Sequence, residues 1–146
     1  MKCENYMSLA FPSRSCNEGF ARAAAACFAA QLDPNLEELG DIKTAVSEAV
    51  TNCIVHAYRD TIGVIQMKCR ILQGNTLEIV IRDKGCGIED VARAREPMFT
   101  TGGSERSGMG FTIMESFMSE LKVTSRPGKG TTVRMKRKIV QRGGKA

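Results

Sequence analysis

The chain has 146 residues, of which 42% are hydrophobic and 25% are charged, a composition typical of a single soluble globular domain spanning 1–146. No apolar run approaches the roughly 18 residues that a membrane span needs, and the N-terminus lacks the apolar region of a signal peptide, so we expect a cytoplasmic protein without membrane contact. The net charge of +5 is unevenly distributed, because the chain from Arg126 onward holds eight Lys and Arg and no acid. We interpret these bases as a solvated strand and a basic tail from about 135, which argues against direct binding of nucleic acid.

The cysteines do not form a recognisable pattern. No two of the six are spaced as C-x-x-C, and the chain has a single His, so neither a zinc site nor a disulfide framework is expected. Cys27 and Cys53 fall in apolar helical stretches, which predicts that they pack as small hydrophobic side chains.

The predicted elements alternate between strands and helices along the chain. An edge strand at 6–11 stops at Pro12, and helices are predicted at 17–32 and from 36 to about 58. Later strands are predicted at 62–72, 77–82, 121–125 and 131–139, and a last helix at 111–117. Helices gathered between antiparallel strand runs predict an α+β fold, a two-layer sandwich whose mixed, mostly antiparallel sheet is covered on one face by helices.

The second predicted helix carries a polar stripe beside its apolar seam. Glu48, Asn52 and His56 lie at i, i+4 and i+8, so they stack along one side of the helix. This pattern is compatible with a solvated helix face. A carboxylate and a carboxamide one turn apart can also serve a nucleotide site, where the carboxylate removes a proton from a hydroxyl and the amide oxygen binds Mg²⁺. For His56 a packed or partly exposed position is favoured.

Two glycine-containing segments suit a nucleotide pocket. Asp83 ends a predicted strand and is followed by Gly85 and Gly87, so its carboxylate could accept a hydrogen bond from an adenine amino group while Gly87 lets the base approach the backbone. Gly108 and Gly110 precede the helix at 111–117, where backbone N–H groups favour phosphate. Taken singly, the first segment is also typical of a strand exit and the second of a flexible helix entry.

The order of these motifs resembles that of the ATP-binding GHKL superfamily, which includes gyrase, Hsp90 and histidine kinases. Three segments are similar to the anti-sigma F factors of spore-forming bacteria, a family of serine kinases that also antagonise a sigma factor. These segments read IKTAVSEAVTN at 42–52, PMFTT at 97–101 and ERSGMGFTIME at 105–115. The resemblance extends from about Tyr6 to Val133 and implies the GHKL (Bergerat) fold, with ATP and Mg²⁺ as cofactors.

The resemblance also implies roles for individual residues. Glu48 would be the general base, Arg106 would approach the γ-phosphate, Asn52 would bind Mg²⁺, and Asp83 would recognise adenine. The remaining nucleotide-binding residues would be Gly85, Gly87, Thr101, Ser107, Gly108, Met109, Gly110, Phe111 and Thr132.

Partners are implied in the same way. Glu18 and Arg22 match positions that the family uses to contact proteins, although at i and i+4 they are equally typical of a surface ion pair. The implied partners are a sigma factor of the sigma F type, an anti-anti-sigma factor that is phosphorylated on serine, and a second copy of the chain in a homodimer. Two alternatives stay open, a module that only sequesters sigma and another GHKL ATPase or histidine-kinase-like domain.

Overall fold

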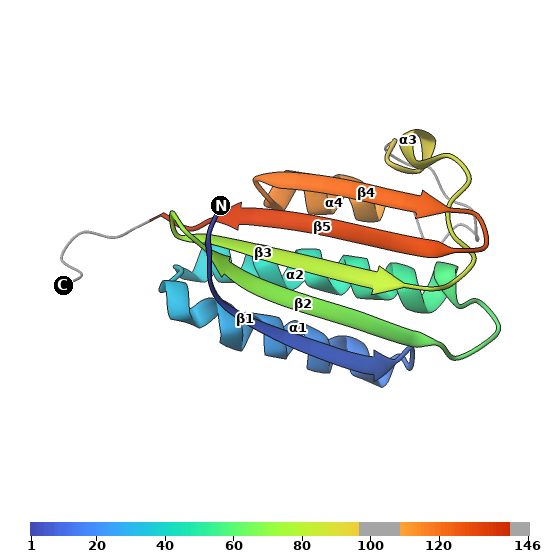
Figure 1. The fold of residues 1–146 in the computed structure, drawn as a ribbon, viewed down its shortest axis with the longest axis horizontal. Helices are drawn as coiled ribbons and strands as arrows, with labels where there is room; N and C mark the ends of the chain where they lie inside the picture. Colours follow the sequence, from blue (N-terminus) through green and yellow to red (C-terminus); the bar gives the residue numbers. More distant parts are fainter. Residues whose placement is uncertain (97–108, 141–146) are drawn as a thin grey trace.

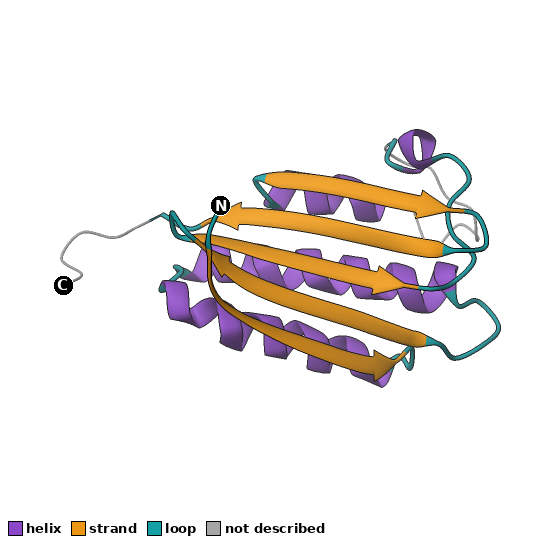
Figure 2. Ribbon diagram, in the orientation of Figure 1, coloured by secondary structure: helices purple, strands orange, loops and turns teal. Residues whose placement is uncertain are grey.

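We analysed a computed structural model that describes residues 1–96 and 109–140, the side chain of Met109 excepted. Its centre is a five-stranded sheet in the order β1-β2-β3-β5-β4, and Figures 1 and 2 show α1, α2 and α4 packed on one side of it. The strands are β1 (Cys3–Pro12), β2 (Val64–Leu72), β3 (Thr76–Asp83), β4 (Glu120–Arg126) and β5 (Gly130–Lys138). The helices are α1 (Cys16–Ala29), η1 (Ala30–Leu32), α2 (Leu36–Asn52), η2 (Cys53–Ala57), α3 (Val91–Ala94) and α4 (Met109–Phe117). The predicted α+β two-layer sandwich is therefore confirmed.

The hydrophobic core lies between the sheet and the helices. Alternate residues of the three central strands, such as Met67, Ile79 and Met135, are almost completely buried on the helix side. On α2, the buried residues Ile42, Val46 and Ala49 form the stripe that packs against this face. The alternate, outward-facing residues of the same strands lie on the opposite side of the sheet.

Several details differ from the predictions. All four strand pairings in the described chain are antiparallel, so the expected mixed sheet has no parallel pair there. The second helix does not remain α-helical to Tyr58, because α2 ends at Asn52 and continues as the π-helical turn η2. Cys27 is exposed on the outer side of α1 rather than packed. The four-residue helix α3 was not predicted, since its main local signal is the cap that Asp90 provides to Arg93 N.

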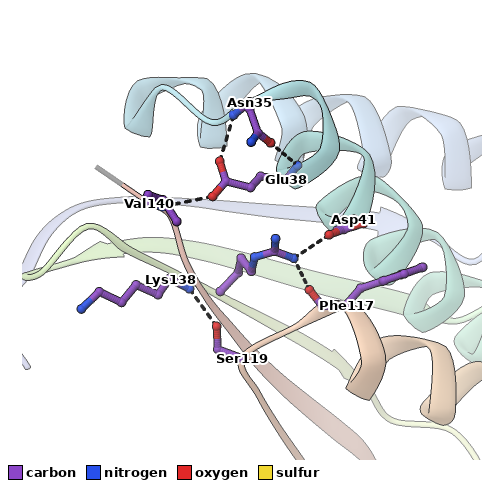
Figure 3. A network of polar contacts seen from close by, with 8 residues as sticks. Asn35, Glu38, Asp41, Phe117, Ser119, Lys138 and Val140 are labelled. Carbon is purple, nitrogen blue, oxygen red and sulfur yellow. Dashed lines mark hydrogen bonds and ion pairs between the residues drawn. The ribbon is translucent and has the colours of Figure 1, made fainter. Parts of the chain in front are cut away.

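The first turn of α2 is joined to the end of β5 (Figure 3). Asn35 and Glu38 form a capping box, in which Asn35 Oδ1 accepts from Glu38 N at 2.7 Å and Glu38 Oε1 accepts from Asn35 N at 2.9 Å. The second oxygen of Glu38 accepts a hydrogen bond from Val140 N at 3.0 Å. The helix that carries Glu48 and Asn52 therefore depends on the last described residue for part of its N-terminal anchoring.

Arg137 makes a second connection in the same region. Its guanidinium contacts Asp41 Oδ2 on α2 at 2.8 Å and donates to the carbonyl of Phe117 at the end of α4. One side chain of β5 thus fixes α2 relative to α4. In the part of the chain that the structure describes, no helix combines the length and apolar character needed to cross a membrane.

Candidate functional site

A cavity of about 460 Å³ opens between η2, the loop after β3, α3, the start of α4 and the start of β5. Five of the predicted site residues line it, namely Asn52, Asp83, Gly87, Gly110 and Phe111. They come from three separate segments of the chain, the end of α2, the end of β3 with the loop after it, and the start of α4. The remaining wall is largely apolar, which suits a planar base, and it includes Ala49, Ile88, Ala94 and Val133.

Asp83 lies at the inner end of the cavity and is 5% exposed. Its Oδ1 accepts hydrogen bonds from Gly85 N at 2.9 Å and from Thr131 N at 3.2 Å, while Oδ2 accepts a weak one from the Cys53 thiol at 3.4 Å. Burial raises the pKa of the Asp83 carboxyl, and the three hydrogen bonds act in the opposite direction. The contacts therefore hold the carboxylate in place through Oδ1 and leave Oδ2 with capacity for a ligand N–H.

The glycines after Asp83 are required by close packing of the backbone. A Cβ atom at Gly85 would lie 2.3 Å from the carbonyl oxygen of Ala57 in η2, and one at Gly87, where φ is +78°, would lie 2.0 Å from the carbonyl oxygen of Arg126. Cys86 N also donates to the Ala57 carbonyl at 3.1 Å. The π-helical turn thus receives the loop after β3, and together they form the floor of the cavity.

Glu48 and Asn52 meet the start of α4. A methyl group added at Gly110 would lie 3.3 Å from both Glu48 Oε1 and Asn52 Nδ2, so the first turn of α4 lies directly against the polar stripe of α2. Both side chains are half-buried. A carboxylate, a carboxamide and a glycine at the start of a helix are therefore adjacent, which is an arrangement suited to phosphate chemistry.

Thr132 lies on the wrong side of the sheet for the role predicted for it. It is paired in register with Arg82 and accepts a hydrogen bond from Arg82 Nε at 3.3 Å on the face away from the helices. Its neighbour Thr131 is opposite Asp83 and lines the cavity. Because side chains alternate along a strand, an error of one residue moves the predicted contact to the other face.

Two direct contacts of Asp83 were not predicted, the backbone N–H of Thr131 and the thiol of Cys53. Cys53 is 3% exposed, and burial together with the nearby Asp83 charge raises its pKa well above the ordinary value, so it stays a thiol that can donate. The position of Cys53 directly after Asn52 is a signal that could have placed it in the site, whereas no local pattern indicates its contact with Asp83.

The residues present fit a magnesium ion held with a nucleotide. Mg²⁺ is bound in such sites through one or two protein ligands together with phosphate oxygens and water, and Asn52 lines the cavity with its Oδ1 atom 3.4 Å from a Cβ atom placed at Gly110. In the described ranges, no group of three or more His, Cys, Asp or Glu is placed to hold a metal ion.

Four predicted residues lie outside the described part of the chain, namely Thr101, Arg106, Ser107 and Gly108. Met109 begins α4. On α1, Arg22 forms an ion pair with Glu18 at 3.2 Å, and Glu18 Oε2 also accepts a hydrogen bond from Ser47 at 2.5 Å. The pair therefore has a structural role, because Glu18 joins α1 to α2 at Ser47, the residue before Glu48. The contact of Glu18 and Arg22 with a partner protein stays a prediction.

Comparison with known proteins agrees with this geometry. Residues 11–137 match the histidine kinase-like ATPase domain family. An anti-sigma F factor of Caldanaerobacter subterraneus subsp. tengcongensis is 58% identical over 140 residues, which cover 95% of this chain and 97% of the relative.

Solved structures share the fold of this chain. The RsbU and RsbW domains of Rv1364c from Mycobacterium tuberculosis superpose with a TM-score of 0.67 at 16% identity, over 93% of this chain and 32% of that one. Full-length ShkA in complex with AMPPNP gives a TM-score of 0.59 at 16% identity, over 86% of this chain and 30% of that one. The chain therefore belongs to the histidine kinase-like ATPases of the GHKL type and, within them, to the family of anti-sigma F factors.

Proposed function

We propose that this chain is an ATP-dependent serine kinase of the cytoplasm that inhibits a sigma factor of the sigma F type and phosphorylates the anti-anti-sigma factor that opposes it. The observation that carries the proposal is the meeting of Glu48 and Asn52 with Gly110 at the start of α4, on the border of a cavity with Asp83 at its inner end. This arrangement supports a nucleotide held by its base at one end and by its phosphates at the other. Family membership supports the two protein partners.

The base end of the proposed site consists of Asp83, Gly87 and Thr131. The Oδ2 atom of Asp83 would accept from the adenine amino group, and the apolar wall with Phe111 would cover the base. Thr131 takes the place predicted for Thr132, because it is the residue on the cavity side of β5.

At the phosphate end, Glu48 accepts the proton of a serine hydroxyl on the partner. The serine oxygen then forms a bond to the γ-phosphorus, and the bond between that phosphorus and the β-phosphate oxygen breaks to leave ADP. Mg²⁺ held by Asn52 and the phosphates would offset negative charge during transfer, and by resemblance Arg106 would assist. The phosphoserine adds about −1.5 to −2 charge to the partner, which weakens its docking and frees the kinase for sigma. We propose that the active form is a homodimer.

The decisive experiment is transfer of label from γ-labelled ATP, in the presence of Mg²⁺, to the cognate anti-anti-sigma protein. We expect label on a partner serine with the wild type, and a loss of roughly 10²- to 10⁴-fold with Glu48→Gln, the usual contribution of a general base. Nucleotide affinity, measured separately, should change little, because glutamine keeps the shape of the side chain.

Glu37→Gln is the matched control, since Glu37 is an exposed residue of the same helix in its first turn. It should transfer label at the wild-type rate. Transfer by Glu48→Gln at the wild-type rate would contradict the assignment of the base. Tight nucleotide binding by the wild type without transfer to any partner would favour a module that sequesters sigma and uses the nucleotide only for regulation.

A further inference from the structure

The side of the sheet away from the helices carries a dense group of basic residues. In Figure 1, α1, α2 and α4 lie behind the sheet, so this side is left uncovered by them. Strand register aligns Lys68, Val80, Arg134 and Lys122 in one row across the sheet, and Arg70, Glu78 and Lys136 in the next. We call the open basic face the surface formed by Lys68, Arg70, Arg82, Lys122, Arg134 and Lys136.

The arrangement of these charges is unfavourable for stability. Three neighbouring rows run across this face of the sheet, one through Arg82, one through Val80 and one through Glu78. Together they contain six Lys or Arg and two Glu, Glu78 and Glu120, so their net charge is +4. Lys122 lies directly opposite Arg134, a like-charge pair that destabilises an antiparallel sheet. Five of the bases from Arg126 onward belong to β4 and β5 rather than to a tail, namely Arg126, Arg134, Lys136, Arg137 and Lys138.

A buried glutamate holds two of the guanidinium groups in place. The Glu78 side chain is 1% exposed, and its Oε1 contacts Arg70 Nε and Nη2 at 2.6 Å while its Oε2 contacts Arg134 Nη1 at 3.2 Å. Each guanidinium has five N–H donors, so these contacts use only part of their capacity. Ordered guanidinium groups with remaining donors lose less conformational entropy on binding a carboxylate than lone surface lysines do.

These side chains surround a hollow of about 560 Å³ on the face. Lys68, Arg70, Arg82 and Arg134 line it, with Val80 and Ala10 forming an apolar part of its floor. A concave surface that combines ordered bases with some apolar area can contact both the carboxylates and the backbone of an extended segment.

We propose that the open basic face binds an acidic segment of a partner protein, with Asp or Glu side chains paired to the ordered arginines and to the lysines around them. Lys68 and Lys122 are three strand spacings apart, roughly 14 Å, a span that about four to five residues of an extended chain cover. The proposal does not depend on phosphotransfer, because none of these residues lines the cavity that contains Asp83.

Charge and composition favour an acidic protein over two other occupants. A second copy of this chain would bring one surface of charge +4 against another, and like charges across an interface oppose association. Single-stranded nucleic acid is bound by basic grooves that also offer aromatic stacking platforms, whereas the three rows contain a single aromatic, Tyr6, whose ring already lies 5.2 Å from Lys68 Nζ.

The test uses fluorescence anisotropy with three labelled probes, an alternating Glu-Ser peptide of about ten residues, the matching Gln-Ser peptide and a thymidine oligonucleotide. We expect the wild-type chain to bind the acidic peptide in preference to both others, and with an affinity that falls as salt is raised. The double variant Lys68→Glu/Lys122→Glu should bind it at least about tenfold more weakly. Its thermal stability should be no lower than that of the wild type, because the change at position 122 replaces a like-charge pair with Arg134 by an opposite-charge pair.

The control variant Lys2→Glu/Lys43→Glu makes the same change in net charge at two exposed positions outside the face. It should keep the affinity of the wild type within about twofold, and an equal loss in both variants would overturn the proposal. Preferential binding of the oligonucleotide would overturn the proposal that an acidic protein segment binds the open basic face. Sedimentation of the same samples tests the remaining occupant, a second copy of the chain. If the wild type is a dimer and the Lys68→Glu/Lys122→Glu variant is a monomer, the face would be assigned to self-association instead.

Discussion

Asp83 is a buried carboxylate whose two oxygens have different partners. Two backbone amides fix Oδ1, whereas Oδ2 has only the Cys53 thiol among the described contacts that involve it. This division explains how a carboxylate can be held rigidly inside a largely apolar cavity and still have an oxygen that could accept a hydrogen bond from a nucleotide base. It also makes the residue sensitive to proton concentration, because its ionised form is poorly solvated there.

At this scale we predict a pH-dependent effect of Asp83→Asn. Burial raises the pKa of Asp83 above its ordinary value of 3.8, so between these two pKa values the native protein binds more protons than the unfolded chain. The free energy of unfolding of the wild type should therefore fall as pH rises through this window, whereas Asn does not titrate. Urea unfolding of both proteins from about pH 4 to pH 7 should show Asp83→Asn gaining stability relative to the wild type. A difference that is constant over this range would contradict the prediction.

At the scale of elements, the contact between α4 and α2 shapes the end of the site that we propose for the phosphates. Gly110 allows the first turn of α4 to approach Glu48 and Asn52, and a Cβ atom there would force both side chains to move by a few tenths of an ångström. We predict that Gly110→Ala lowers phosphotransfer by about tenfold or more, since small displacements of catalytic groups are costly. The helix itself should tolerate alanine.

Gly40→Ala is the matched control for this substitution. Gly40 lies within α2, is exposed, and has no atom within 4 Å of an added Cβ. Alanine there should stabilise the helix by up to about 1 kcal/mol and leave the transfer rate unchanged. Equal rates for Gly110→Ala and the wild type would show that the α2–α4 contact does not control the chemistry.

Arg137 joins three elements, because it extends from β5 to Asp41 on α2 and to Phe117 at the end of α4. Both charged side chains are only 19% exposed, so replacing the arginine would leave a poorly hydrated carboxylate. We predict that Arg137→Met lowers the free energy of unfolding by about 2–4 kcal/mol, measured with urea. Arg95→Met removes an ion pair to Glu115, which is 62% exposed, and should cost at most about 1 kcal/mol. Equal losses would argue against a special role for Arg137.

For the whole molecule, the hydrophobic pattern predicted the layers and the motif order predicted the position of the cavity. The details that these sequence patterns did not predict depend on contacts between distant segments. The π-helical turn after Asn52 is stabilised by the loop that contains Gly85, which lies some 30 residues later in the chain, so local periodicity could not indicate it. The choice between Thr131 and Thr132 depends on the register of β5 with β3, and two consecutive threonines give no local signal for it.

The position of β5 has a consequence for the order in which the protein is made. This strand is last in the sequence, yet it lies between β3 and β4 in the sheet, supplies Thr131 to Asp83, and is followed by Val140, whose N–H binds Glu38. A nascent chain that ends before residue 130 therefore exposes the edge of β3 and has an incomplete anchor for α2. Because the pairings of β5 join segments far apart in sequence, the cavity that contains Asp83 is completed only after β5 has been synthesised.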